Sequence, residues 1–143
     1  MVNDYHYRIA YADTDAGGVV YHGRYLEIAE RARLEMLRDC GLLTMVVALG
    51  RQRPGDFAAT GESQQLVVRH CTIDYRLPVR LDDLVTVRSR VTDWGGASFN
   101  LEQTLWVAEE LKVTMVVKLA CIDGEFRPKR IPSLLRERLS TSS

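Results

Sequence analysis

Hydrophobic and polar positions alternate over residues 4–11 of this chain. Tyr5, Tyr7, Ile9 and Tyr11 fall on one face, which is typical of a β-strand with one buried side. Beyond this segment, apolar positions recur at intervals of three and four residues. They are Tyr25, Ile28, Ala29, Ala32, Met36 and Cys40. This spacing predicts one long amphipathic helix, and its inward-facing alanines would let the helix lie close to a sheet.

The alternating pattern returns in the second half of the chain and predicts four more strands. Their approximate ranges are 65–77, 84–94, 97–108 and 111–122. The sequences WGGA and AEEL separate the last three ranges and are typical of tight turns, so these strands should be joined by hairpins. A short helix is expected from Pro132 to Leu139, and the polar, glycine-containing segment 50–64 is expected to form a loop.

The order of these elements indicates the α+β class. One strand, one long helix and four further strands predict a five-stranded antiparallel sheet wrapped around the helix. Residues 1–143 would form a single domain, since no linker or repeat interrupts the pattern. Such a sheet has two open edges, and edges of this kind are often protected by pairing with a second subunit. We therefore expect at least a homodimer.

Composition and charge exclude several classes of protein. The chain has 19 basic and 19 acidic residues, whereas a general nucleic-acid-binding protein is normally basic. No apolar run approaches the roughly 20 residues that span a bilayer, and the polar start MVNDYHYRIAYADTD is unlike a signal peptide. Cys40, Cys71 and Cys121 are far apart and form no Cys-x-x-Cys pair, so neither a disulfide framework nor a metal site is expected. A cytoplasmic location fits these features best.

The segment DTDAGGVVYHGRY, from Asp13 to Tyr25, concentrates the residues best suited to chemistry. Asp15 precedes an Ala-Gly-Gly bend, where backbone amides and a ligand can approach closely. His22 lies just before the helix, where free N–H groups and the positive end of the helix dipole are found. A carboxylate near such donors can attack a polarised carbonyl or activate water against it. The alternative is that this segment is only a structural loop, because Asp13 and Asp15 are also good turn formers.

The same segment resembles a known family. YADTDAGGVVYHGRYLEIAERARLEMLR is similar to the Tol-Pal-associated and 4-hydroxybenzoyl-CoA-type acyl-CoA thioesterases of the hotdog superfamily. The similarity continues through IDYRLPVRLDDLVTVRSRV, the GGASF turn and the closing RPKRIP, and so covers nearly the whole chain. The resemblance implies the hotdog fold, a helix wrapped by an antiparallel sheet. It also implies a homodimer or homotetramer with active sites at the interface between chains.

The resemblance further implies an activity and roles for three residues. The expected reaction is hydrolysis of an acyl-CoA to a free acid and CoA. Asp15 would be the catalytic carboxylate, as nucleophile or general base, His22 would assist, and Tyr21 would line the site. No metal and no cofactor are expected, because CoA is part of the substrate.

Basic residues near the C-terminus are candidates for contacts with the phosphates of CoA. Arg127, Lys129 and Arg130 stand together in the sequence FRPKR, and arginine suits phosphate recognition. The alternative is a solvated basic turn before the last helix. Arg88 and Arg90, on one strand face, are a second candidate.

The sequence does not distinguish this activity from several other functions, and it does not identify the acyl group. A hotdog thioesterase acting on acyl-carrier protein, an acyl-CoA hydratase, and a non-catalytic acyl-CoA-binding or protein-binding module are the alternatives. The acyl group could be aromatic or a short or long aliphatic chain. The segment 50–64 would lie near the acyl group, and its role is undecided.

Overall fold

The computed structural model describes residues 2–43 and 65–140. The predicted segment 50–64 therefore lies outside the described residues. The elements in chain order are β1 (Val2–Arg8), the short 3₁₀ helix η1 (Tyr11–Asp13), α1 (Arg24–Asp39), β2 (Gln65–Tyr75), β3 (Leu84–Trp94), β4 (Ser98–Val107), β5 (Glu110–Ile122) and α3 (Ser133–Ser140). This order and the α+β class agree with the sequence-based prediction.

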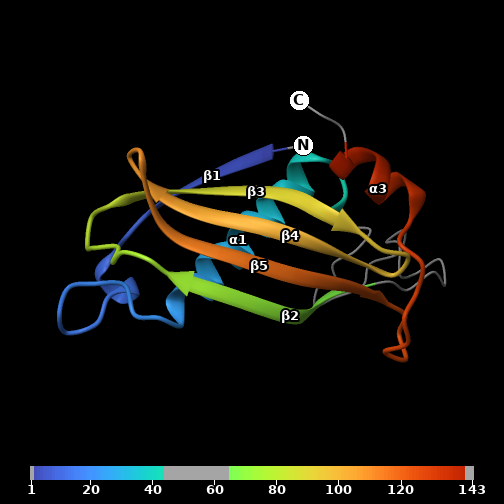
Figure 1. Cartoon of the computed structure of the whole chain (residues 1–143), viewed down its shortest axis with the longest axis horizontal. Coiled ribbons are helices and arrows are strands. Elements are labelled where there is room, and N and C mark those ends of the chain that lie inside the picture. The colour runs from blue at the N-terminus through green and yellow to red at the C-terminus, as the bar shows by residue number, and fades with distance from the viewer. Residues whose placement is uncertain (1, 44–64, 141–143) are drawn as a thin grey trace, which may run out of the picture.

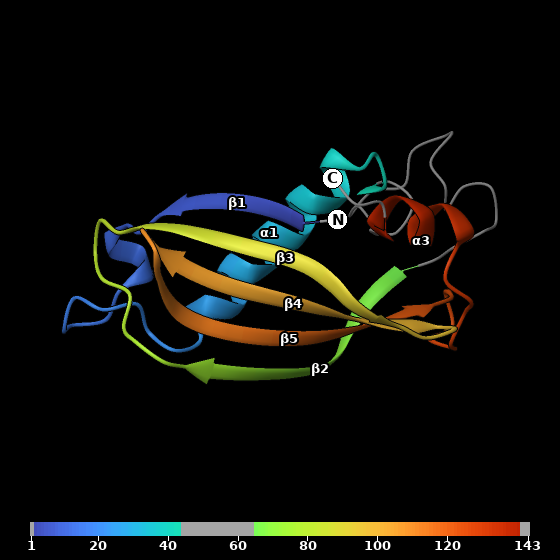
Figure 2. The ribbon, with the colours of Figure 1, turned by 45° about the horizontal axis from the view of Figure 1, so that its top comes forward.

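The five strands form one antiparallel sheet in the order β1-β3-β4-β5-β2. The sheet curves around α1, which crosses one face, while the other face is uncovered by the described elements (Figure 1, Figure 2). Tight turns join β3 to β4 and β4 to β5, as predicted. In contrast, β2 and β3 are not neighbours. β2 lies at the far edge beside β5, so the chain crosses from one side of the sheet to the other between them.

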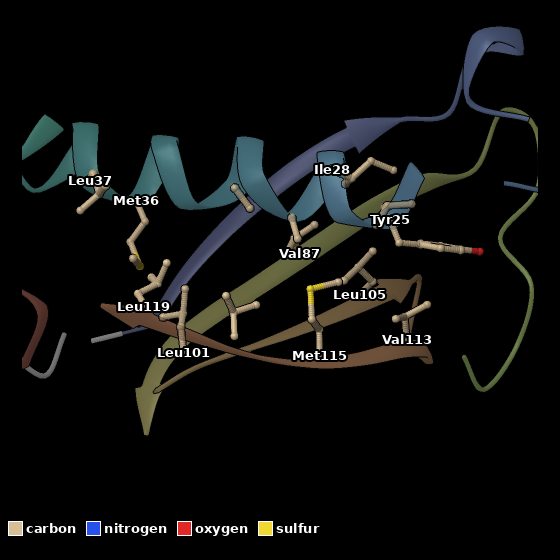
Figure 3. Close-up of a cluster of buried hydrophobic side chains, with 14 of the residues drawn as sticks. Tyr25, Ile28, Met36, Leu37, Val87, Leu101, Leu105, Val113, Met115 and Leu119 are labelled. Carbon is tan, nitrogen blue, oxygen red and sulfur yellow. The ribbon is translucent and has the colours of Figure 1, made fainter. Parts of the chain in front are cut away.

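The core lies between α1 and the concave face of the sheet. Tyr25, Ile28, Met36 and Leu37 of α1 point toward side chains from three central strands (Figure 3). The labelled strand residues are Val87, Leu101, Leu105, Val113, Met115 and Leu119. Ala29 and Ala32 are fully buried, which confirms that small side chains bring the helix close to the sheet.

The first strand is shorter than the alternating pattern predicts. β1 ends at Arg8, and Tyr11 belongs to η1 with 82% of its surface exposed, so the expectation that Tyr11 shares the inner face is wrong. The Ala10 amide donates to the Asp13 carboxylate at 2.8 Å, and this local bond turns the chain away from the sheet.

No helix within residues 2–43 and 65–140 is long and apolar enough to cross a membrane.

Candidate active site

Asp15 lies in a tight loop between β1 and α1, where backbone amides hold its carboxylate. Oδ1 accepts hydrogen bonds from the Gly17 amide at 2.8 Å and from the Val19 amide at 3.4 Å. The Asp15 side chain is exposed, and Oδ2 accepts no hydrogen bond from the described part of the chain. The carboxylate is therefore oriented through one oxygen, and the other is open to a ligand or a water molecule.

Gly17 and Gly18 in this loop are suited to their positions for different structural reasons. A Cβ atom at Gly17 would lie 3.3 Å from Oδ1 of Asp15, so the carboxylate approaches the backbone more closely than a side chain there would allow. Gly18 has a φ angle of +79°, a conformation that favours glycine. The Gly18 amide donates to the Asp15 carbonyl at 3.1 Å and closes the turn.

The buried side chain of Asp13 anchors this loop to the rest of the fold. Its side chain is fully buried and accepts hydrogen bonds from the Tyr7 hydroxyl at 2.9 Å and from the Ala10 amide at 2.8 Å. Arg24, the first residue of α1, donates from Nε to Oδ1 of Asp13 at 2.6 Å. The backbone carbonyl of Asp13 also accepts from the Tyr21 amide at 3.3 Å. One carboxylate thus joins β1, the Asp15 loop and the start of α1.

The charges in this anchor are stabilised by one another. Burial alone would raise the pKa of the Asp13 carboxyl, but the Ala10 amide, the Arg24 guanidinium and the Tyr7 hydroxyl together lower that pKa below its ordinary value. Burial and the nearby carboxylate raise the pKa of Tyr7, and the hydrogen bond to Asp13 raises the pKa of Arg24. At neutral pH the anchor is therefore an ionised pair with a neutral phenol.

His22 follows Asp15 in the same loop and borders a shallow hollow of about 270 Å³. The hollow is also lined by Tyr25, Tyr75 and Leu77, and the Tyr75 hydroxyl donates to the His22 carbonyl at 2.9 Å. The His22 imidazole is exposed. Asp15 does not line this hollow, and no hydrogen bond joins the Asp15 and His22 side chains. Within one chain, therefore, the two predicted site residues share a loop without a hydrogen bond between their side chains.

The amino end of α1 faces the same region. Gly23 occupies the N-cap, so no side chain caps the first-turn amides. Amides at a helix start can stabilise negative charge on a ligand. Tyr21, the third predicted site residue, is 38% exposed beside this helix start. Its carbonyl accepts from the Arg24 amide at 3.0 Å.

The predicted phosphate-binding residues lie at the opposite end of the sheet. Arg127, Lys129 and Arg130 follow β5, whereas the Asp15 loop adjoins the other end of the strands (Figure 1, Figure 2). Arg127 forms ion pairs with Glu125 at 2.9 Å and with Asp123 at 3.5 Å. Arg130 borders a separate hollow beside α3. One chain does not bring these residues together with Asp15, His22 and Tyr21.

The sequence pattern does not reveal the partners that position the loop. It marks Asp13 as a turn former and assigns no role in the site to Tyr7, Arg24 or Tyr75. One signal was present for Arg24. A cation in the first turn of a helix is unfavourable to the helix dipole, so its presence there indicates a nearby acid.

Comparison with known proteins places this fold and loop in a defined class. The family model described as the thioesterase-like superfamily matches residues 9–139. The chain therefore belongs to this superfamily, and the observed sheet and helix are the hotdog fold of these thioesterases.

Three relatives are similar over most of their length. The chain is 39% identical over 128 residues to the acyl-CoA thioesterase YbgC of Haemophilus influenzae, covering 87% of this chain and 85% of that protein. It is 35% identical over 127 residues to the acyl-CoA thioester hydrolase YbgC of Escherichia coli O6:H1, covering 87% and 86% respectively. A solved structure of a probable thioesterase from Bartonella henselae matches with a TM-score of 0.80 and 39% identity, covering 92% of this chain and all of that one (100%).

Proposed function

We propose that this protein is an acyl-CoA thioesterase and that Asp15 is its catalytic carboxylate. The observation that supports the role of Asp15 is its geometry. Two backbone amides orient Oδ1, and Oδ2 accepts no hydrogen bond from the described residues and is open to a ligand. Membership of the thioesterase-like superfamily and the similarity to acyl-CoA thioesterases support the reaction class.

The proposed chemistry requires no metal and no cofactor other than the CoA of the substrate. Oδ2 of Asp15 attacks the thioester carbonyl to form a mixed anhydride that water then hydrolyses, or it removes a proton from a water molecule that attacks the carbonyl directly. In both routes the C–S bond breaks, and a proton from water reaches the departing sulfur. First-turn amides of α1 stabilise the negative charge that develops on the carbonyl oxygen. His22 and Tyr21 flank the substrate, and CoA leaves as a thiol.

We also propose that the working form is a homodimer or a homotetramer built from dimers. β2 is an 11-residue edge strand that pairs only with β5 among the described residues. Antiparallel pairing of two β2 strands across a two-fold axis would place the Tyr75 end of one chain beside the Gln65 end of the other. A second copy would then border the open side of the Asp15 loop. The three cysteines form no disulfide, which is compatible with the proposed cytoplasmic location.

Thiol release from a panel of acyl-CoAs tests this proposal. The panel includes aromatic, short aliphatic and long aliphatic esters, and it compares the parent protein with Asp15→Asn. We expect CoA release by the parent and a loss of at least about a hundredfold in kcat for the variant, as for removal of a positioned acid–base group. Asp93→Asn, at an exposed position in β3, is the matched control and should retain the parent rate.

Other outcomes identify the alternatives. Turnover only of acyl-carrier-protein esters indicates the carrier-protein thioesterase, and addition of water to crotonyl-CoA indicates the hydratase. No turnover by the parent, with acyl-CoA binding retained in Asp15→Asn, indicates a binding module. Equal turnover by the parent and Asp15→Asn would refute the role of Asp15.

A further inference from the structure

The outer face of the sheet has a group of basic side chains that the site described above does not use. Arg69, His70 and Lys118 line one groove on the face opposite α1, together with Thr72, Asn100 and Val116. Within residues 2–43 and 65–140, no acidic residue lines this groove. None of the three basic side chains forms an ion pair with a carboxylate among the described residues.

A β-bulge creates this concentration of charge. The pairing of β2 with β5 shifts between Val68 and His70, so Arg69 is an extra residue in the strand. Leu66 lies against the core before the bulge, and Cys71 and Ile73 do so after it. Because Cys71 is an odd number of positions, five, after Leu66, the inward parity changes at the bulge. Arg69 faces outward by the parity before the bulge, and His70 faces outward by the parity after it. Two consecutive basic side chains therefore share the outer face beside Lys118, the β5 residue paired with His70.

Other arginines on this face are neutralised by neighbouring acids. Arg88 pairs with Asp4 at 3.0 Å, and Arg90 pairs with Glu102 at 3.1 Å. Arg127, the first residue of the predicted phosphate-binding turn, pairs with Glu125 and Asp123. Arg69, His70 and Lys118 are thus better placed than these residues to receive an external anion.

An exposed aromatic ring lies next to the groove. Arg69 also borders a second hollow, which is lined by Val67, Ala120, Phe126 and Pro128. Phe126 is 79% exposed and has a φ angle of +63°, an unusual backbone conformation for a bulky residue. Two hydrogen bonds hold the backbone of the turn around Phe126, because Oδ1 of Asp123 accepts the Glu125 amide at 2.8 Å and the Arg127 amide at 3.0 Å. An aromatic face exposed to solvent suits stacking with a purine base.

We propose that this outer-face site binds the 3′-phosphoadenosine diphosphate end of CoA. Arg69, His70 and Lys118 bind the phosphates, and Phe126 stacks against the adenine. The inference rests on the proposed acyl-CoA substrate and assigns its nucleotide to β2 and β5 instead of the Arg127–Arg130 turn. Tyr75, which contacts the His22 loop, is six positions after Arg69 in β2. Six positions span about 20 Å of strand, and the pantetheine arm would run along the outer face from the end of β2 to the groove.

The decisive experiment compares substrates with and without the nucleotide. Acyl-CoA is compared with the same acyl group on N-acetylcysteamine, which lacks phosphates and adenine. In the double variant Arg69→Gln/Lys118→Gln we expect KM for acyl-CoA to rise at least about tenfold, because charge-assisted hydrogen bonds are lost, with kcat unchanged. The kcat/KM for the N-acetylcysteamine ester should equal that of the parent. Phe126→Ala should raise KM for acyl-CoA selectively in the same way.

Two matched variants complete the design. Arg88→Gln/Arg90→Gln removes two ion-paired arginines from the same face and should leave KM for acyl-CoA unchanged. Arg69→Lys/Lys118→Arg keeps both charges and should restore most of the parent KM. An unchanged KM in Arg69→Gln/Lys118→Gln, or an equal loss with both substrates, would overturn the inference.

Calorimetric titration with CoA separates this inference from the proposed activity. If the parent binds CoA but hydrolyses no ester, and Arg69→Gln/Lys118→Gln weakens binding at least about tenfold, the CoA-binding site is supported and the proposed thioesterase activity is refuted. If the parent hydrolyses acyl-CoA and the double variant binds CoA as tightly as the parent, the activity stands and the site is refuted. Absence of CoA binding by the parent would refute the site.

Discussion

The Nε atom of Arg24 donates a 2.6 Å hydrogen bond to Oδ1 of Asp13, and this contact joins the first turn of α1 to the loop that bears Asp15. A cation at the amino end of a helix is opposed by the helix dipole. The fully buried Asp13 carboxylate offsets that cost, and the Tyr7 hydroxyl and Ala10 amide satisfy its remaining acceptor capacity. The orientation of the proposed catalytic loop thus depends on a charge pair beneath it.

Replacement of Asp13 by Asn should destabilise the protein. The substitution removes one of the two carboxylates that pair with the partly buried Arg24 guanidinium, since Glu27 is the other, and the loss of a charge-assisted hydrogen bond of this kind costs about 2 kcal/mol. Urea unfolding at pH 7 measures this loss. Asp93→Asn, which changes an exposed carboxylate, is the control and should leave the free energy of unfolding unchanged within about 0.5 kcal/mol.

The contribution of Asp13 to stability should also depend on pH. Its pKa is lower in the folded protein than its ordinary value, so the ionised carboxylate stabilises the fold above the unfolded pKa of about 3.9. This stabilisation is lost as the pH falls through the lower folded pKa. The difference in unfolding free energy between the parent and Asp13→Asn should therefore be constant from pH 7 to about pH 5 and shrink below about pH 4. A difference that stays constant down to pH 3 would contradict this account.

Gly17→Ala should impair catalysis more than folding. The added Cβ would lie 3.3 Å from Oδ1 of Asp15, so the carboxylate must shift by a few tenths of an ångström. We expect kcat to fall about tenfold with little change in KM, because misplacement of a reacting group costs rate. Gly96→Ala is the control, since nothing lies within 4 Å of a Cβ there. Equal kcat values for the two variants would show that the close approach at Gly17 has no catalytic consequence.

Tyr75→Phe should loosen the His22 part of the loop. The variant loses the 2.9 Å hydrogen bond from the Tyr75 hydroxyl to the His22 carbonyl but keeps the ring that packs against Tyr25 at 5.5 Å between centroids. We expect a loss of about 1 kcal/mol in transition-state stabilisation, seen as a several-fold fall in kcat/KM. Tyr11→Phe, at a ring that is 82% exposed, should behave as the parent. If both tyrosine variants match the parent, the hydrogen bond does not position the loop.

Gln103→Leu should destabilise the core although it replaces a polar residue by an apolar one. The buried Gln103 amide donates to the Ala29 carbonyl and to the Ser89 hydroxyl, both at 3.0 Å, and its oxygen accepts from Arg33 at 3.0 Å. Leucine would leave these groups unsatisfied, at a cost of about 1–3 kcal/mol. Thermal and urea unfolding measure the change. The same substitution at the half-buried Gln65, at the start of β2, is the comparison and should cost less than 1 kcal/mol.

The periodicity of the sequence predicted most of the fold because one face of each element is buried. The helix stripe from Tyr25 to Met36, the alternating apolar positions of β4 and those of β5 from Val113 onward lie in the observed core. The exceptions have local or long-range causes. Tyr11 lies outside β1 because the Ala10–Asp13 hydrogen bond turns the chain away from the sheet. The position of β2 beside β5 depends on the chain crossing the sheet between β2 and β3, and hydrophobic alternation does not encode that crossing.

The sequence predicted which segment contains the candidate site, but it did not predict how the residues of the site are arranged in space. The composition of residues 13–25 and the family resemblance singled out Asp15, His22 and Tyr21, whose catalytic roles remain predictions. The structure added the anchor of Asp13, Tyr7 and Arg24 and separated the basic turn at Arg127 from the Asp15 loop. The alternation of hydrophobic and polar residues does not predict the bulge at Arg69. A single extra residue in a strand can be recognised only when its pairing with the partner strand is known.

The sequence by itself determined the class of this protein, the order of its elements and the loop that concentrates reactive groups. These properties depend on neighbouring residues, whose spacing fixes which side chains share a face. Only the tertiary structure decided that one buried carboxylate anchors β1, the loop and α1, and that Arg69, His70 and Lys118 lie together on the outer face of β2 and β5. These contacts join residues far apart in the chain, so they follow from strand order and register.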